Sequence, residues 1–553
     1  MKTRFMALLV ALVMVLSMAP MASAEEVKQF DVTFLNCWSG SSANFPDDMA
    51  TNPAAQFVAE KFGLNFTFSD NGGNQSEVEY LNMMFSAGTL PDVVNAPYWG
   101  ADMGGEGYVC QQGAVEGMVK NIAPYLEQFP NLKAIFDTEG ILSKSYVKSM
   151  IECADYEEEG AIYFLPTGIN MNSAEFASVY CDTLFAREDV LEAVGWKAED
   201  VTDTDKLVEF LRAVKEAGIT DWNGNAIIPL GTGHDGWRNA NIYNWLRGNN
   251  ISNWRQLEDG SVSYYLFTDY VEGRIKLMKT LFDEGLIDLE CLTQTDEIAN
   301  TKLANGQYAV ASVDANYIVN VVEYGQLNTL DAHPEATWVP LGLKNLDGNN
   351  CVDVYQPGYS GGGEVFFSAD IEEEKLLAIL SFMDWLCTEE GQAFHYYGVE
   401  GVTMQRDEKG RPALLPEIQA EMEEDGSVKT KKYGIELFNM ACYDQRETNW
   451  AKTDDELTAQ ELRYRQMQNY FRPRAEVNAL SVEYLLQNWE GYTDLNDALN
   501  ILDAGTKIQQ AYYYETWEEV EAMLADLRQK ALDTGIEEAF AYIEANLTED
   551  YAF

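Results

Sequence analysis

The chain has 553 residues, of which 46% are hydrophobic and 12% aromatic, a composition that can fill large globular cores. Its 90 acidic residues against 37 Lys and Arg give a net charge of −53, which disfavours nucleic acids and anionic membranes as partners through electrostatic repulsion. The length allows two large lobes or three ordinary domains.

The first 24 residues have the pattern of a cleaved secretory signal. Lys2 and Arg4 precede an apolar run from Met6 to Met18, and the small residues Ala22–Ala24 follow. The run has about 13 residues, fewer than the ~20 that a membrane-spanning helix needs. A lipid-anchored receptor requires a cysteine at the cleavage site, and the nearest one, Cys37, lies well beyond it. We therefore expect a secreted protein, extracellular or periplasmic, without a lipid anchor.

Predicted strands and helices alternate along the chain. Residues 30–36 alternate apolar and polar side chains as a half-buried strand does, and a helix (52–62), a strand (64–69) and another helix (76–86) follow. The end of the chain, from Thr516, has the apolar spacing of a helix. No linker rich in Pro, Gly or Ser divides the chain. The alternation predicts an α/β protein whose lobes are discontinuous in sequence.

The eight cysteines are widely spaced and include no C-x-x-C pair, so no zinc or thioredoxin pattern is present. Export permits disulfides, but a chain of this size does not depend on them. We expect buried free thiols, with Cys387 and Cys442 in apolar helical segments.

Six strings occur in a fixed order along most of the chain. They are SAGTLPDVVNAPYW (86–99), GAIYFLPTGINMNS (160–173), TLFAREDVLEAVGW (183–196), LFDEGLIDLE (281–290), NGQYAVASVDANY (305–317) and MDWLCTEEGQAFHYYGVEGVT (383–403). Together they resemble the extracellular solute-binding proteins of bacterial ABC importers, the large oligosaccharide receptors of family 1 with the class 2 periplasmic-binding fold. The resemblance implies two α/β lobes joined by a hinge, a ligand held between them, and a membrane permease as partner.

The resemblance also implies where the chain crosses between the lobes. The crossings are expected near 162–167, near 355–363 and just after Thr403. Residues 25–163 with 358–405 would form one lobe, and residues 164–357 with 406–553 the other. The glycines of the second crossing suit a hinge because glycine accommodates changes in φ and ψ.

Residues 358–362 (GYSGG) match the G-x-S-x-G nucleophile elbow of hydrolases. That elbow needs a helix directly after the serine, whereas residues 364–367 have a strand pattern and the next helix begins only near Glu372. The chain also has only three histidines to supply a base. We interpret the segment as a hinge and count Tyr359 among the candidate ligand contacts.

Residues 231–236 (GTGHDG) match G-x-G-x-x-G and follow an apolar run. A dinucleotide site also needs an acid about 20 residues later, and residues 255–260 resemble a turn instead. By resemblance, this stretch lines the ligand site. Backbone N–H groups at a helix start, together with His234, Trp237 and Arg238, could then donate to ligand oxygens or stack on a ring.

Asp221, Asn223 and Asn225 resemble the start of a calcium loop found in some relatives of the same receptors. A full loop needs a bidentate acid at its twelfth position, which Thr232 occupies here. We favour a turn built on Asn-Gly and expect no cofactor, while calcium at these three residues stays a weaker alternative.

Aromatic residues mark the candidate ligand site most clearly. Sugars combine polar rims with apolar C–H faces, so their sites pair flat rings with hydrogen-bonding side chains. Rings on loops that the resemblance places against the ligand are Trp38, Tyr98, Trp99, Trp237 and Tyr317, with Trp450 as a weaker sixth. The alternative for each ring is an ordinary place in the core.

These patterns together predict a monomeric, non-enzymatic binding protein that captures an oligosaccharide and delivers it to an ABC permease. Two alternatives remain open from the sequence: a secreted acidic carbohydrate-active enzyme, and a surface sensor or adhesin with the same fold.

Overall fold

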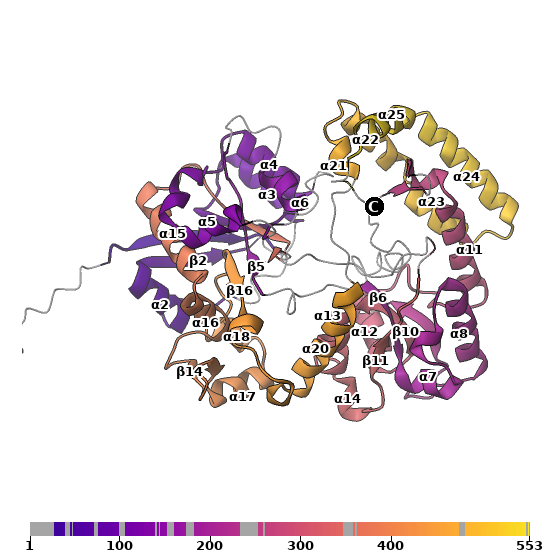
Figure 1. The fold of residues 1–553 in the computed structure, drawn as a ribbon, viewed down its shortest axis with the longest axis horizontal. Coiled ribbons are helices and arrows are strands. Elements are labelled where there is room, and N and C mark those ends of the chain that lie inside the picture. The colour runs from indigo at the N-terminus through magenta and orange to yellow at the C-terminus, as the bar shows by residue number, and fades with distance from the viewer. Residues whose placement is uncertain are drawn as a thin grey trace, which may run out of the picture.

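The computed structural model describes residues 27–38, 45–46, 48–70, 76–98, 105–138, 141–142, 144–151, 160–172, 182–232, 253–257, 260–344, 346, 358–359, 362–474, 482–548 and 551. They form two lobes, each built around its own β-sheet (Figure 1). The predicted signal at residues 1–24 lies outside the described part. Among the described helices, none combines the length and the apolar character needed to cross a bilayer.

The first lobe contains a five-stranded sheet in the order β2-β1-β3-β13-β4. Strand β1 runs parallel to β2 and β3, while β13 is antiparallel to β3 and β4. The strands are β1 (Phe30–Asn36), β2 (Leu64–Ser69), β3 (Val93–Pro97), β4 (Leu165–Pro166) and β13 (Gly363–Phe367). Helices of this lobe are α2 (Pro53–Phe62), α3 (Glu77–Ala87), α4 (Glu106–Val115), α5 (Pro130–Asp137), α6 (Lys144–Tyr146), α15 (Glu373–Leu386), α16 (Glu389–Tyr397), α17 (Pro416–Glu424), α18 (Val428–Lys431) and α19 (Arg446–Asn449).

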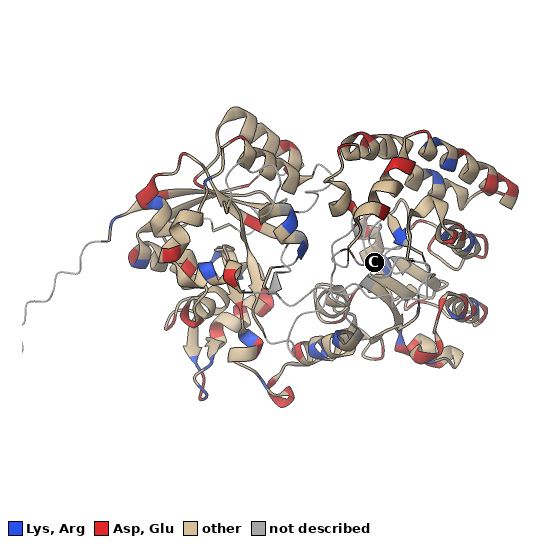
Figure 2. Cartoon of the chain, turned by 45° about the horizontal axis from the view of Figure 1, so that its top comes forward, with Lys and Arg blue, Asp and Glu red and all other residues tan. Residues whose placement is uncertain are grey.

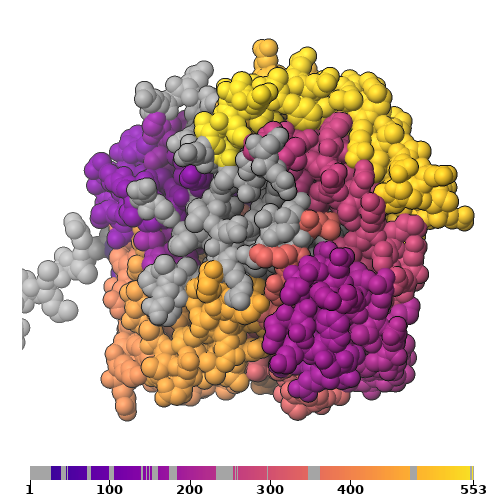
Figure 3. Space-filling model, turned by 45° about the vertical axis from the view of Figure 1, so that its right-hand side comes forward, coloured from indigo at the N-terminus to yellow at the C-terminus, as the bar shows by residue number. Residues whose placement is uncertain are grey.

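The second lobe contains a four-stranded sheet in the order β11-β6-β10-β7, in which β10 and β7 are parallel. The strands are β6 (Asp182–Arg187), β7 (Ile228–Thr232), β10 (Tyr308–Asp314) and β11 (Trp338–Pro340), with a hairpin of β8 (Trp254–Gln256) and β9 (Val262–Tyr264). Its helices are α7 (Glu188–Val194), α8 (Thr204–Glu216), α11 (Asp269–Asp283), α12 (Asp296–Ala304), α13 (Ala315–Tyr317), α14 (Thr329–Ala332), α20 (Ala459–Phe471), α21 (Val482–Leu486), α22 (Tyr492–Leu502), α23 (Ala504–Ala511), α24 (Trp517–Leu532) and α25 (Ile536–Asn546). Figure 3 shows the C-terminal helices in yellow on the surface of this lobe. Their buried side chains belong to the same hydrophobic core as those of α11.

Shorter helical turns connect these elements. They are η2 (Ala123–Gln128), η3 (Val147–Ile151), η4 (Ala198–Asp200), η6 (Tyr265–Phe267), η7 (Ile318–Glu323), η8 (Asp454–Glu456) and η9 (Arg472–Arg474).

The five elements predicted from periodicity are all confirmed: β1, α2, β2, α3 and α24. Local signals fix their ends. Asn52 caps α2 by accepting hydrogen bonds from two backbone N–H groups, and Gly63 closes the helix in the left-handed region at φ 71°. Thr516 and Glu519 form a capping box at the start of α24.

The hydrophobic core is divided between the lobes. Each cluster of buried apolar side chains in the described chain lies within one lobe: residues 30–171 with 365–450 in the first, and residues 184–346 with 464–551 in the second. The predicted α/β fold with two discontinuous lobes is therefore confirmed.

A small three-stranded sheet marks where the chain passes between the lobes. Strand β5 (Gly168–Asn170) pairs with β12 (Gly358–Tyr359) and with β16 (Cys442–Asp444). The chain leaves the first lobe after Asn172 and again after Trp450. These positions differ from the predicted boundaries, because residues 437–443 pack in the core of the first lobe and not of the second. The third crossing follows Trp450 instead of Thr403.

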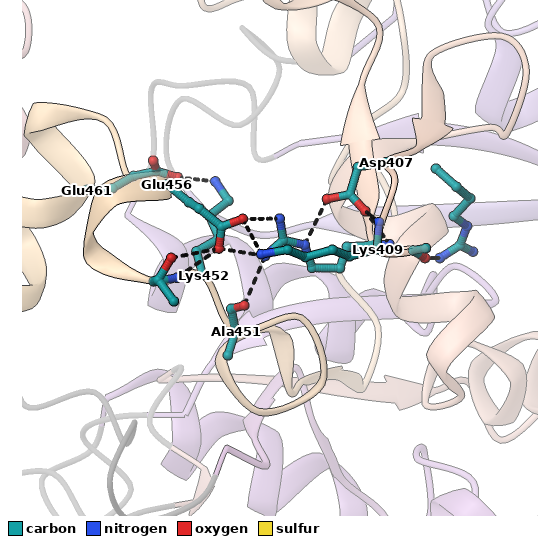
Figure 4. A network of polar contacts seen from close by, with 10 residues as sticks. Asp407, Lys409, Ala451, Lys452, Glu456 and Glu461 are labelled. Atoms are coloured by element: carbon teal, nitrogen blue, oxygen red, sulfur yellow. Dashed lines mark hydrogen bonds and ion pairs between the residues drawn. The ribbon is translucent and has the colours of Figure 1, made fainter.

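Ion pairs hold the third crossing at both of its ends (Figure 4). On the first lobe, the hairpin of β14 (Met404–Arg406) and β15 (Pro412–Leu414) presents Arg411, whose Nη2 donates to Glu456 Oε1 at 2.9 Å. Lys409 Nζ donates to the same oxygen at 2.6 Å. On the second lobe, Lys452 Nζ donates to Glu461 Oε1 of α20 at 2.7 Å. The crossing is therefore tied to both lobes.

Candidate functional site

Trp38 lies just beyond the carboxyl end of β1, at the end of the first sheet where its parallel strands terminate. Its indole Nε1 donates to Asn95 Oδ1 at 3.0 Å, and the buried Asn95 amide donates to the Asn439 carbonyl at 3.2 Å. A Cβ atom at Gly363 would lie only 2.9 Å from Trp38 Cζ2 and 3.0 Å from Thr167 Oγ1. Glycine at 363 thus gives room to the half-buried indole ring.

Tyr98 follows the neighbouring strand β3 at the same end of the sheet. Its backbone N–H donates to the Gly362 carbonyl at 3.0 Å, and its ring meets that of Tyr146 edge to face, with centroids 5.3 Å apart. In open α/β sheets, ligands bind beyond the carboxyl ends of parallel strands. The structure therefore brings two of the predicted aromatic residues, Trp38 and Tyr98, to the carboxyl ends of neighbouring parallel strands.

Glu364 is the second residue of β13, and it is buried in the sheet opposite Ala96 of β3. Its side chain has no exposed surface, and neither carboxyl oxygen has a nitrogen or oxygen partner among the described residues. Burial raises the pKa of Glu364 well above its usual value, with the Cys110 thiol beside it. Burial thus favours the protonated, neutral form of this carboxyl group.

In the second sheet, the carboxyl end of β10 carries two buried polar residues, Ser312 and Asp314. The backbone of Ser312 pairs with that of Thr232 at the end of β7. Asp314 Oδ1 accepts the backbone N–H of Tyr317 at 2.7 Å, which fixes the turn after the strand. Tyr317 itself is 8% exposed, and its hydroxyl donates to Asn300. Its ring thus packs in the core, the alternative that the sequence left open.

Trp450 also packs in a core, between Ala393 and Met404 of the first lobe. Its indole Nε1 donates to Glu389 Oε1 at 3.2 Å and its side chain is 7% exposed. In this conformation the ring offers no face to a ligand.

Several predicted contacts fall outside the described residues. These are Trp99, His234, Trp237, Arg238 and the side chain of Tyr359, whose backbone pairs with Ile169. Residues 234–238 follow β7 by sequence, so their role remains a prediction.

The GYSGG segment joins two strands. Strand β12 ends at Tyr359 and β13 begins at Gly363, while the next helix, α15, begins only at Glu373. The serine is therefore not followed by the helix that a nucleophile elbow requires.

The possible calcium residues form a tight turn. Asp221 Oδ1 accepts the N–H groups of Asn223 at 2.9 Å and Asn225 at 2.7 Å, while Oδ2 accepts the Asn225 side-chain amide at 3.0 Å. Although burial opposes the shift, these bonds lower the pKa of Asp221. The carboxylate is thus used within the turn. In the described chain, no group of three or more His, Cys, Asp or Glu could hold a metal ion.

Five of the eight cysteines lie in the described part, and all five are buried free thiols as predicted: Cys37, Cys110, Cys291, Cys387 and Cys442. Cys442, however, lies in strand β16 and not in a helix as predicted. Burial raises the pKa of Cys37, Cys291 and Cys442 to about 12, so these thiols are unreactive at neutral pH.

Sequence reasoning missed a polar group at the point where β5 and β16 end. The two strands run parallel, and the Met171 N–H donates to the Asp444 carbonyl at 2.9 Å. Arg446 pairs with the Asp444 carboxylate and lies over the ring of Tyr396, with Cζ 3.7 Å from the ring centroid. Strand β16 has three residues and forms only against β5, so no local pattern could place this group.

No protein-family model and no curated protein matches the sequence. Solved structures do match the fold. The ABC-transporter substrate-binding protein FusA of S. pneumoniae, in complex with kestose, is 16% identical and superposes with a TM-score of 0.62 over 93% of this chain and 98% of its own. An HMO-binding, ABC-transporter-associated solute-binding protein of Bifidobacterium longum infantis is 15% identical, with a TM-score of 0.62 over 93% and 98%. The alginate-binding protein AlgQ2 is 16% identical, with a TM-score of 0.60 over 94% and 98%. The chain therefore has the two-lobed fold of the solute-binding proteins of ABC transporters.

Proposed function

We propose that this protein is the extracellular solute-binding component of an ABC importer. It captures an oligosaccharide between its two lobes and delivers it to a membrane permease, with no bond made or broken. The observation that carries the proposal is the division of one chain into two separate cores joined by three crossings, a build that allows the lobes to close on a ligand.

The chemistry of the sheet edges supports a sugar as the ligand. Trp38 and Tyr98 supply partly exposed rings on the first lobe, where they follow the carboxyl ends of β1 and β3. Two of the matched structures are named for sugar ligands, kestose and alginate. Export by the N-terminal signal would place the receptor outside the membrane, where such solutes are captured.

Calorimetry of the purified mature chain against a panel of oligosaccharides, peptides and polyamines tests the proposal. We expect one oligosaccharide class to bind with one site per chain. Binding of peptides or polyamines without any oligosaccharide would contradict the assignment of the ligand. Release of reducing ends during long incubation would contradict the non-enzymatic role.

A further inference from the structure

The pair of Asp444 and Arg446 forms a rigid planar group beside the crossings. Arg446 Nε donates to Asp444 Oδ1 at 3.0 Å, and Nη2 donates to Oδ2 at 2.9 Å. The guanidinium carbon Cζ lies over the Tyr396 ring, 3.7 Å from its centroid. The two hydrogen bonds and the contact with the aromatic ring fix the orientation of the guanidinium.

One side of this group is left without a protein partner. No described residue accepts a hydrogen bond from Nη1 of Arg446. The side chains are 41% exposed for Arg446 and 27% for Asp444. Asp444 Oδ1 also accepts the Arg446 backbone N–H at 3.1 Å, and the Asn172 side chain hydrogen-bonds to the carboxylate. The exposed side of the pair therefore presents the Nη1 donor beside the remaining acceptor positions of the carboxylate.

The position of the pair suits contact with a ligand held between the lobes. Asp444 ends β16, and its register partner Asn170 ends β5, two residues before the chain leaves the first lobe. Asn172 accepts the Thr448 N–H at 3.1 Å, which ties the two departing segments together. The pair thus lies where the two lobes join.

Charge decides which ligand the pair favours. Hydrogen bonding and attraction from Arg446 lower the pKa of Asp444 against the effect of burial, and Asp444 in turn raises the pKa of Arg446. Both groups stay ionised at neutral pH, so the pair carries no net charge. Acidic residues are spread over both lobes (Figure 2), and the chain has a net charge of −53. The negative charge of the protein would repel an anionic sugar. The positive charge of Arg446 would not offset this repulsion, because Asp444 already neutralises it.

We infer that Arg446 and Asp444, oriented by Tyr396, form a subsite for two neighbouring hydroxyl groups of a neutral sugar. Nη1 donates to one hydroxyl oxygen and the Asp444 carboxylate accepts from the adjacent hydroxyl. This inference rests on the proposed function, and it narrows the ligand to neutral oligosaccharides in preference to uronates.

The test is calorimetry with a neutral trisaccharide, kestose, and an acidic one, an alginate trisaccharide. A matched control is Arg212→Gln, because Arg212 makes the same two-bond pair with Glu284 on the second lobe, at 2.7 and 2.6 Å. Arg446→Gln should weaken binding of the neutral sugar by about tenfold or more, the loss expected for a hydrogen bond from a charged donor. Arg212→Gln should bind like the original chain.

Asp444→Asn provides a second, independent outcome. It leaves the guanidinium without its counter-charge, so the preference for the neutral sugar over the uronate should fall. Unchanged binding in both Arg446→Gln and Asp444→Asn, or a preference of the original chain for the uronate, would overturn the subsite. If the original chain binds no oligosaccharide of either kind, the proposed function fails instead.

Discussion

Gly363 is a single position where a missing side chain shapes the candidate site. Replacement by Ala would place a Cβ atom 2.9 Å from the Trp38 ring, closer than real Cβ contacts allow, so the indole must shift. We expect Gly363→Ala to weaken oligosaccharide binding, change tryptophan fluorescence and destabilise the fold by about 1–3 kcal/mol.

The control for this substitution is Gly168→Ala on β5, where a Cβ would meet no atom within 4 Å. Fluorescence, calorimetry and urea unfolding of both variants measure the effect. Equal binding by the two variants would show that Trp38 does not touch the ligand.

Glu364 makes stability depend on pH. Its pKa is raised by burial from a usual value of 4.5, so the unfolded chain loses this proton at a lower pH than the folded chain does. The free energy of unfolding is therefore highest below pH 4.5 and falls as pH rises. It falls by about 1.4 kcal/mol per pH unit until the carboxyl group of the folded protein ionises. Glu364→Gln does not titrate, and its stability advantage over the original chain should grow from pH 4.5 toward neutrality.

Urea unfolding over that pH range checks the expectation. Glu537→Gln, at an exposed position of α25, is the control and should show no such trend. A stability difference for Glu364→Gln that stays constant with pH would mean that Glu364 is ionised in the folded protein.

At the scale of elements, the sequence predicts those whose signals are local. Helices α2 and α24 carry their own caps at Asn52 and Thr516, and β1 has a clear alternation of apolar residues. Strands β4, β5, β12 and β16 have only two or three residues each, and they form by pairing with distant segments. For this reason the third crossing and the Asp444–Arg446 pair could not be located from the sequence. The same limit applies to Tyr317 and Trp450, whose burial depends on packing between distant elements.

The ion pairs at the third crossing predict a specific sensitivity to protease. Glu456 accepts from Arg411, from Lys409 and from the Thr453 N–H at 3.0 Å, and these bonds lower its pKa. Glu456→Ala should loosen the crossing and speed tryptic cleavage after Lys452. Glu421→Ala removes an ion pair with Lys432 that spans no crossing, and should leave this cleavage unchanged. Mass spectrometry measures the cleavage rates. Equal rates in the two variants would show that the ion pairs of Glu456 do not stabilise the third crossing.

At the scale of the whole molecule, two cores and three crossings define what can move. Each lobe keeps its own core. In the proposed function the lobes therefore close as rigid bodies, through changes in backbone angles where the chain passes between them. A ligand shifts this equilibrium only through its higher affinity for the closed form. Closure would thus report to the permease that a ligand is bound.

Small-angle X-ray scattering of the mature chain, alone and saturated with the oligosaccharide that binds best, tests this account most directly. We predict a smaller radius of gyration with the ligand, at one ligand per chain, and no change with an oligosaccharide that calorimetry shows not to bind. A saturated complex whose radius equals that of the free chain would contradict the central claim that this protein captures its solute by closing two lobes around it.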